Sequence, residues 1–348
     1  MKINKVILLC FTIFIILFSL NFKQRANASA NSGIIVMEKT SQRILYGENY
    51  SAKLPMASTT KIVTAITFLD NFDVNKIVEI PSDFKGVEGS SVYLKGGDKF
   101  SAIDLLYGLM LRSGNDCAEI LSSAFCSRQE FICLMNKTAK RCEANNTHFT
   151  NPHGLHDDEH YTTAEDLAKI TCYALKNQIF KKIVSTKKYI ATELSKNENR
   201  VWLNKNKMLN SFDGATGVKT GYTVKAGRCL VSSAKRDGME VICVVLNVYD
   251  MFERSKMLLD KAFDEYKLVK LFSKDKFDYK IPDENLNYYK LRVEKDFYYP
   301  ISKNDKIQLE LNLPKYLNKQ NILGEKVGEI KIYTQKQLIF YQNIYTLK

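Results

Sequence analysis

The sequence predicts an α+β protein, a larger domain of strands and helices followed by a small β-rich domain. Strand-like segments open the chain after residue 30, helical periods dominate the middle, and strands return after Gly214. Beyond about residue 275, short runs of alternating apolar and polar residues replace the helical periods. With 348 residues, the chain is long enough for two domains of ordinary size.

The first 30 residues are predicted to be a secretory signal peptide. Lys2 and Lys5 precede a largely apolar run over residues 6–20, and small residues follow at Ala28 and Ala30. We therefore expect cleavage near Ala28 or Ala30 and an exported protein of the cell envelope, secreted or membrane-associated. An uncleaved anchor stays open as an alternative, although a spanning helix usually needs about 20 apolar residues.

The chain is basic, with a formal charge of +13. Residues 1–30 carry four lysines and arginines and no acidic residue, so the remaining chain has a charge of +9. This charge favours peripheral contact with anionic wall polymers or lipid headgroups, and a lysine-rich surface without a specific patch is the alternative. Nucleic acid is not expected as a partner, because an exported chain rarely meets it.

Seven cysteines follow residue 30, an odd number, and they are predicted to be free thiols. Cys133 and Cys243 lie in apolar contexts, which is typical of buried cysteines. No Cys-x-x-Cys pair occurs, so zinc and redox motifs of that type are absent from the sequence. We expect no disulfide framework.

The elements are expected in the following order. Two strands cover residues 33–37 and 43–46, and a helix covers about 58–69, because Ile62, Ile66 and Leu69 recur at helical spacing. Then come a helix-rich segment over 101–122 with a capping box from Ser101 to Asp104, helices over 128–142 and 163–176 with a cap at Thr163 and Asp166, strands over 217–222, 228–234 and 239–246, a hairpin turn at 235–238, and a helix over 251–266 capped by Asp250 and Glu253.

Ser58 and Lys61 form the first candidate for chemistry. They lie three residues apart, so both face one side of the predicted helix. A serine needs a base to become a nucleophile, and a partly desolvated lysine can lose its proton near neutral pH. The first backbone N–H groups of the helix would stabilise an oxyanion. Ser-x-x-Lys alone is a weak signal, because it also occurs at Ser82, Ser185, Ser232 and Ser273.

Two further motifs single out Ser58. Ser113-Gly114-Asn115 follows after a gap of 55 residues, and Lys219-Thr220-Gly221, which occurs once, follows after another 106. The ordered set Ser-x-x-Lys, Ser-x-Asn and Lys-Thr-Gly is that of penicillin-interacting enzymes. Together the three motifs are a strong signal.

Residues 105–116, 151–155 and 213–223 then make the resemblance specific, because they look like low-molecular-mass D,D-carboxypeptidases of the penicillin-binding class. The resemblance covers about residues 32–270 and continues more faintly into the tail. It implies a β-lactamase/transpeptidase-like catalytic domain, an antiparallel sheet with helices and a mainly helical subdomain, followed by the small β-rich domain. We place the catalytic domain at residues 31–272 and the β-rich domain at 273–348.

The resemblance also implies a role for each matching residue. Ser58 is the nucleophile, Lys61 its base, and Ser113 relays a proton to the leaving D-alanine. The substrate is held by Asn115, the charge of Lys219, the strand edge at Thr220 and Gly221, the backbone N–H of Tyr222 in the oxyanion hole, and Arg254 at the terminal carboxylate. Each has a structural alternative, and for Arg254 this is an ion pair with Glu253 or Asp250.

No cofactor or metal is expected. His153, His156 and His160 are clustered in sequence, but the resemblance explains residues 151–155 as a structural turn, and no zinc-hydrolase motif accompanies them. Glu193 to Asn197 loosely resembles a water-positioning pair of β-lactamases, but its polar context favours chance.

The expected function is that of a serine D-Ala-D-Ala carboxypeptidase that trims peptidoglycan stem peptides through an acyl-enzyme at Ser58. β-Lactam antibiotics would acylate the same serine and inhibit it. A β-lactamase or a D,D-transpeptidase is the alternative within the enzyme class. A non-hydrolytic penicillin-binding scaffold or sensor of the cell envelope is the alternative outside it.

Overall fold

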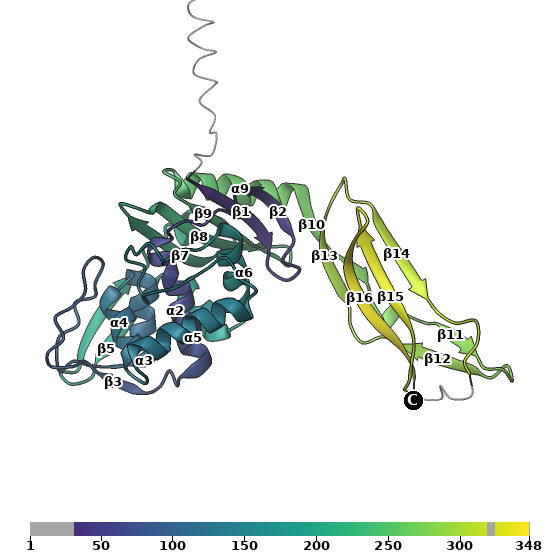
Figure 1. The fold of residues 1–348 in the computed structure, drawn as a ribbon, viewed down its shortest axis with the longest axis horizontal. Coiled ribbons are helices and arrows are strands. Elements are labelled where there is room, and N and C mark those ends of the chain that lie inside the picture. The colour runs from purple at the N-terminus through teal and green to yellow at the C-terminus, as the bar shows by residue number, and fades with distance from the viewer. Residues whose placement is uncertain (1–30, 319–323, 348) are drawn as a thin grey trace, which may run out of the picture.

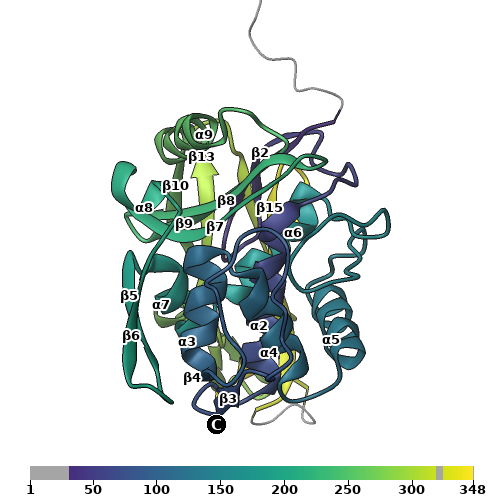
Figure 2. The same cartoon turned by 90° about the vertical axis from the view of Figure 1, so that its left-hand side faces the viewer.

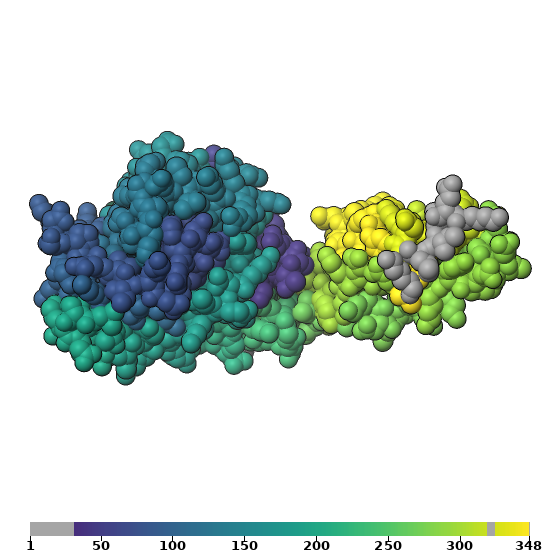
Figure 3. Space-filling view, turned by 90° about the horizontal axis from the view of Figure 1, so that it is seen from below, coloured from purple at the N-terminus to yellow at the C-terminus, as the bar shows by residue number. Residues whose placement is uncertain are grey.

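The computed structural model describes residues 31–318 and 324–347, and the predicted signal peptide lies outside these residues. Figure 1 shows a larger lobe of strands and helices and a smaller lobe of strands. Figure 3 shows the same two lobes from below, with the smaller lobe in green and yellow. This is the predicted order of an α+β domain followed by a β-rich one.

A five-stranded antiparallel sheet forms the centre of the larger lobe, and its strands confirm those predicted from the sequence. β7 lies at one edge of this sheet and β2 at the other. In spatial order the strands are β2 (Ile44–Glu48), β1 (Gly33–Glu38), β9 (Met239–Leu246), β8 (Gly227–Arg236) and β7 (Ala215–Thr223).

Both faces of this sheet are covered, which explains the continuous apolar runs of its central strands. Ile35 and Met37 of β1 pack into the core under the helices, whereas Ile34 and Val36 pack into a second core with α9 (Met251–Glu265). Figure 2 shows the sheet between α9 on one side and α2 and α6 on the other. Asp250 precedes α9, but its side chain makes no cap hydrogen bond, contrary to prediction.

The helices surround α2 (Lys61–Asn71), whose residues 61–68 are all buried. The predicted segment 101–122 is helical but broken at Ser113, which has a left-handed φ of 64°. The caps at Ser101 and Thr163 are confirmed, since each hydroxyl accepts a backbone N–H three residues later. The other helical elements are η1 (Ala57–Thr60), α3 (Ala102–Tyr107), η2 (Gly108–Arg112), α4 (Asn115–Ser123), α5 (Arg128–Arg141), α6 (Ala164–Ala174) and α7 (Gln178–Ser185).

Several short elements of the larger lobe were not predicted. They include α7 and two hairpins that lie outside the central sheet. In the second hairpin Ile190 faces Val201, and both side chains are exposed, so the alternation that signals a half-buried strand is weak. These elements are β3 (Ile77–Glu79) with β4 (Lys99–Ser101), β5 (Lys188–Glu193) with β6 (Glu198–Leu203), and the short α8 (Met208–Ser211).

The smaller lobe contains a second antiparallel sheet in the order β11-β12-β16-β15-β14 and a strand pair, β10 with β13. Its core gathers Ile281, Leu291, Ile330 and Ile344. β10 directly follows α9 and pairs with β13, so this strand belongs to the smaller lobe by its hydrogen bonds. The strands are β10 (Tyr266–Phe272), β11 (Lys280–Pro282), β12 (Tyr288–Arg292), β13 (Phe297–Ser302), β14 (Ile307–Asn312), β15 (Lys326–Thr334) and β16 (Gln337–Thr346), with the short helix η3 (Lys274–Lys276) after β10.

Arg43, directly before β2, connects the two lobes. Its guanidinium donates to both carboxylate oxygens of Asp305, at 2.8 and 2.7 Å, and to the carbonyl oxygen of Pro300 at 2.6 Å. The same group lies 5.2 Å from the ring centre of Tyr266 and 5.1 Å from that of Tyr299. A bidentate pair with two aromatic neighbours is a strong and directional contact.

The seven cysteines of the described chain are free thiols, as predicted. Cys243 is buried, but Cys133 is exposed, so the apolar neighbours of Cys133 in sequence did not indicate burial. It lies on an outward face of α5, whose inward residues Phe131, Ile132 and Met135 are buried. Within the part of the chain that the structure describes, no helix has the length and apolarity needed to cross a membrane.

Candidate active site

Ser58 lies in the 3₁₀ turn η1, which leads directly into α2. The predicted helix therefore exists, but its first turn is tighter than an α-helix. Ser58 is half-buried, and its Oγ is 2.9 Å from Nζ of Lys61, which is within hydrogen-bond distance. The predicted pair of hydroxyl and amine is thus in contact.

Lys61 is fully buried and surrounded by oxygen atoms. Besides Ser58 Oγ, its Nζ contacts Oδ1 of Asn115 at 2.6 Å and the carbonyl oxygen of His153 at 2.7 Å. Both of these oxygens can only accept hydrogen bonds, so they take both hydrogens of a neutral amine. The remaining lone pair then points at the Ser58 hydroxyl, which is the direction a base requires.

The electrostatic surroundings favour this neutral amine. Burial, and then the neighbouring Lys219 ammonium, hold the pKa of Lys61 well below its ordinary value. Burial, with a smaller contribution from Lys205, lowers the pKa of Lys219 to about 7. Burial of a lysine beside a second positive charge is a typical way to make an amine basic at neutral pH.

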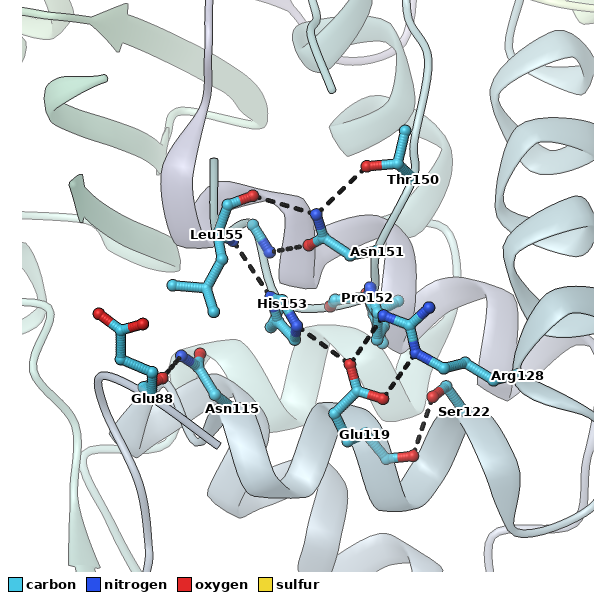
Figure 4. Close-up of polar contacts among 12 residues, drawn as sticks. Glu88, Asn115, Glu119, Ser122, Arg128, Thr150, Asn151, Pro152, His153 and Leu155 are labelled. Atoms are coloured by element: carbon cyan, nitrogen blue, oxygen red, sulfur yellow. Dashed lines mark hydrogen bonds and ion pairs between the residues drawn. The ribbon is translucent and has the colours of Figure 1, made fainter. Parts of the chain in front are cut away.

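Ser113 and Asn115 are held at the break between η2 and α4. Ser113 adopts the left-handed conformation and is 5% exposed. Nδ2 of Asn115 donates to the carbonyl oxygen of Glu88 at 2.5 Å (Figure 4). This bond fixes the amide with its Oδ1 at the Lys61 amine. The backbone N–H of Asn115 donates to the carbonyl oxygen of Ser90 at 2.7 Å.

The Lys-Thr-Gly sequence lies on β7, the edge strand of the central sheet. Lys219 is 2% exposed and donates to the carbonyl oxygen of Thr220 at 2.7 Å, whereas Tyr222 is exposed. A Cβ at Gly221 would lie 3.0 Å from the backbone nitrogen of Ser58, so the glycine permits close packing of β7 against η1. An open strand edge beside the nucleophile can bind an extended peptide.

The turn over residues 151–155 supports the nucleophile from behind, and its predicted structural role fits these contacts. Gly154 has a φ of +89°, and a Cβ there would lie 2.0 Å from the carbonyl oxygen of Ala57, so any larger residue would clash. Ala57 itself has a left-handed φ of 48°, a strained conformation directly before Ser58. Thr64 Oγ1 donates to the carbonyl oxygen of Pro152 at 2.6 Å.

The three clustered histidines make hydrogen bonds or ion pairs with neighbouring side chains and backbone groups. His160 accepts the N–H of Thr150 at Nδ1, 3.1 Å away, and its Nε2 lies 2.8 Å from Oγ1 of Thr60 in η1. Burial lowers the pKa of His160 to about 3, so the ring is neutral. His153 pairs with Glu119 and the exposed His156 with Asp158. No group of three or more potential metal ligands occurs among residues 31–318 and 324–347.

Glu193 also has a structural role. Its carboxylate accepts hydrogen bonds from the backbone N–H groups of Lys99, Ser195 and Lys196 and from the hydroxyl of Ser195. These bonds hold the turn between β5 and β6. This structural role fits the interpretation that the resemblance of residues 193–197 to the water-positioning pair of β-lactamases is due to chance.

Arg254 is not brought to the site, and this corrects the role predicted for it. Its guanidinium contacts Glu48 at 2.8 Å and the hydroxyl of Tyr46 at 3.3 Å, both on β2. β2 is the edge of the sheet opposite β7, and α9 carries Arg254 across the face away from Ser58. Arg254 therefore forms an ion pair, which was the alternative to a substrate-binding role, but its partner is Glu48 and not the expected Glu253 or Asp250.

Lys205 was missed from the sequence. Its Nζ donates to Oγ of Ser90 at 3.1 Å, and its charge contributes to the lowered pKa values of Lys219 and Lys61. Burial, and then Arg112, lowers the pKa of Lys205 itself. It stands in a polar stretch rich in lysine and asparagine, where no residue pattern distinguishes one lysine from another.

Two family models match this chain. The model described as D-alanyl-D-alanine carboxypeptidase matches residues 21–250, and that of the penicillin-binding protein 5 C-terminal domain matches residues 266–348. The chain is 33% identical over 254 residues to D-alanyl-D-alanine carboxypeptidase DacF of Bacillus subtilis. The matched region is 69% of this chain and 64% of DacF, so the chain spans less than two thirds of the length of that relative. It is 36% identical over 219 residues to the D-alanyl-D-alanine carboxypeptidase of Streptomyces sp. strain K15, covering 58% of this chain and 75% of that protein.

Solved structures of similar architecture span nearly the whole chain. The D-alanyl-D-alanine carboxypeptidase DacD from Francisella tularensis superposes with a TM-score of 0.71 at 26% identity, over 93% of this chain and 95% of that one. Penicillin-binding protein 5 from Haemophilus influenzae gives a TM-score of 0.75 at 25% identity, over 91% and 96%. The predicted fold, a transpeptidase-like catalytic domain followed by a β-rich domain, is thereby confirmed.

Proposed function

The chain belongs to the D-alanyl-D-alanine carboxypeptidase family, and from this we propose that it removes the terminal D-alanine from peptidoglycan stem peptides. The observation that carries the proposal is the contact of 2.9 Å between Ser58 Oγ and a buried Lys61 whose pKa is strongly lowered. A hydroxyl beside a neutral amine is an activated nucleophile.

In the proposed reaction, Ser58 Oγ attacks the carbonyl carbon of the penultimate D-alanine while its proton passes to Lys61. The N–H groups of Ser58 and Tyr222 stabilise the oxyanion. The C–N bond then breaks, and the departing D-alanine amine takes a proton through Ser113. Water then gives a proton to the neutral amine of Lys61 and attacks the ester carbon. The bond between this carbon and Ser58 Oγ breaks, and the proton passes from Lys61 to Oγ, which releases the shortened peptide and restores the Ser58 hydroxyl.

Substrate binding follows from the open edge of β7. The stem peptide lies along Thr220 and Gly221 as an added strand, and Asn115 holds its amide. Lys219, with Lys205 nearby, supplies positive charge for the carboxylate end of the substrate. This pair takes the place of Arg254, which lies at the opposite edge of the sheet.

β-Lactams would acylate Ser58 and persist there, because their leaving group stays tethered to the acyl carbon. The protein would act outside the cytoplasm after removal of residues 1–30. Its catalytic domain would cover residues 31–265 and its small β-rich domain would begin with β10, earlier than the boundary at 272/273 predicted from the sequence, because β10 pairs with β13. Its positive charge would allow peripheral contact with anionic wall polymers or lipid headgroups. Trimming would remove donor peptides for cross-linking and so affect cell shape.

One experiment tests the proposal. The chain from residue 31 and its Ser58→Ala variant are incubated with labelled penicillin and with a peptide ending in D-Ala-D-Ala. Release of free D-alanine and covalent labelling by the unmodified chain, and neither by Ser58→Ala, is the expected result. Ser273→Ala, which alters another Ser-x-x-Lys in the smaller lobe, is the matched control and should retain both activities.

The alternatives give different results in the same assay. Stable labelling without release of D-alanine would indicate a binding protein or sensor. Rapid loss of the label would indicate a β-lactamase, and transfer of the peptide to an added amine would indicate a transpeptidase.

A further inference from the structure

The His153 ring is held at both of its nitrogen atoms. The backbone N–H of Leu155 donates to Nδ1 at 3.1 Å, so the ring hydrogen must be on Nε2. Nε2 lies 3.0 Å from Oε1 of Glu119 on α4 (Figure 4). The ring is 7% exposed and has little freedom to turn. A carboxylate that accepts from one ring nitrogen often fixes the tautomer and the orientation of a histidine.

Glu119 is itself fixed by Arg128, the first residue of α5. The guanidinium contacts the carboxylate through two nitrogen atoms, Nε to Oε2 at 2.8 Å and Nη2 to Oε1 at 3.0 Å. Burial would raise the pKa of Glu119, but the bonds from His153 and Arg128 outweigh it and lower the pKa to about 2. The carboxylate therefore stays charged, and the three side chains join α4, α5 and the turn of residues 151–155.

The turn also has limited freedom along its backbone. Oδ1 of Asn151 accepts the N–H of Gly154 at 2.7 Å, and Nδ2 of Asn151 donates to the carbonyl oxygen of Leu155 at 3.0 Å. With its ring and its backbone both held, the peptide group of His153 has a defined position. Its carbonyl oxygen is the one that takes a hydrogen from Lys61 at 2.7 Å.

Helix α4 thus controls both oxygens that orient the amine of Lys61. Asn115, in the first turn of α4, provides Oδ1 directly. Glu119, one helical turn further, acts on the second oxygen through His153. If the carbonyl of His153 shifted, the lone pair of Lys61 would turn away from Ser58, and a misplacement of about 1 Å can cost roughly 100-fold in rate.

We propose that Glu119, braced by Arg128, is a positioning residue that sets the direction of the base Lys61 by holding the peptide of His153. This inference rests on the proposed function, since it assigns a role to Lys61 in acylation. Glu119 does not touch the substrate in this scheme. It changes the rate of the acylation step and leaves the affinity for the substrate unaltered.

The test measures acylation by a chromogenic β-lactam at saturating and subsaturating concentrations, which separates the rate of acylation from the dissociation constant of the first complex. Glu119→Leu should slow acylation by roughly 10- to 100-fold with a dissociation constant within about twofold of the unmodified chain. Glu119→Gln retains an acceptor for Nε2 of His153, so it should slow acylation less than Glu119→Leu does. The number of active sites, titrated with labelled penicillin, should stay the same in both variants.

Glu130→Gln is the matched control. Glu130 lies on the same helix as Arg128 and caps that helix with Ser127, and its side chain is exposed. It should weaken α5 without slowing acylation. Acylation at the normal rate in Glu119→Leu, a fall in affinity instead of rate, or an equal loss in Glu130→Gln would overturn the inference. Absence of acylation in the unmodified chain would instead contradict the proposed function.

Discussion

The two lobes differ in the kind of ionisable side chain that they bury. In the larger lobe Lys61 and Asp116 are fully buried and Lys219 is 2% exposed, and both lysines have strongly lowered pKa values. In the described part of the smaller lobe, the carboxylate of Asp305 is 1% exposed, but it is paired with Arg43, whose hydrogen bonds lower the pKa of Asp305 to about 2. Buried amines with lowered pKa values are typical of catalytic sites, so this contrast is consistent with the reaction that we propose for the larger lobe.

The largest effect is expected from the base of the larger lobe. Lys61→Arg keeps the positive charge but cannot lose a proton, so acylation of Ser58 by penicillin should fall by roughly 100- to 10,000-fold. The rate of labelling measures this. Lys188→Met changes the exposed lysine of another Ser-x-x-Lys and should label normally. Comparable rates for Lys61→Arg and the unmodified chain would mean that Lys61 is not the base.

The second prediction concerns the pH dependence of stability. The pKa of Lys219 is about 7 in the folded protein and near its ordinary value of 10.5 after unfolding, so between these values the unfolded chain binds more protons. The contribution of Lys219 to the free energy of unfolding therefore rises with pH over this window, by at most about 1.4 kcal/mol per pH unit.

Denaturant unfolding of the unmodified chain and of Lys219→Met at pH 7, 8 and 9 checks this. The stability of the unmodified chain relative to the variant should increase at each step. If the difference in the free energy of unfolding between the two proteins stayed constant from pH 7 to 9, Lys219 would have an ordinary pKa. The larger lobe would then contain one lysine with a lowered pKa at the site, Lys61, instead of two.

The third prediction concerns the contact between the lobes. In Arg43→Met the carboxylate of Asp305, 1% exposed, loses its partner, which should cost about 3 kcal/mol and lower the thermal midpoint of the smaller lobe. Acylation of Ser58 should remain within about twofold. Arg141→Met removes an exposed pair with Asp70 and should cost less than about 1 kcal/mol. Equal shifts in the two variants would mean that Arg43 is no more than a surface contact.

The smallest effect is expected at Cys133. As the exposed cysteine on α5, it should react with a maleimide faster than Cys172, Cys229 and Cys243, in each of which burial raises the pKa to about 12. Cys133→Ser should remove the fast phase and change the free energy of unfolding by less than about 0.5 kcal/mol. Mass spectrometry of the labelled peptides identifies the site.

The elements that the sequence predicted well are those whose apolar periodicity reflects burial on a defined face. The strands β1, β7, β8 and β9 and the helices α2, α5, α6 and α9 are of this kind. The hairpin β5–β6 was missed because its exposed side carries apolar residues such as Ile190 and Val201, and its alternation is weak. Burial of Cys133 was wrong because local apolar neighbours do not show which side of a helix faces the core.

Sequence order alone selected Ser58, Lys61, Ser113, Asn115 and Lys219 as candidates, because three short motifs in a unique order require no knowledge of distance. The structure brings Lys61 into contact with Ser58 and Asn115. For Arg254 and Lys205 the sequence order was not sufficient. Arg254 was assigned to the site but pairs with Glu48 at the opposite edge of the sheet. Lys205 was not selected from the sequence, although it lies beside Ser90 and, after burial, contributes to the lowered pKa of Lys219. Only packing decides which charged residues share an environment, since the electrostatic effect on a pKa depends on burial and distance and not on separation along the chain.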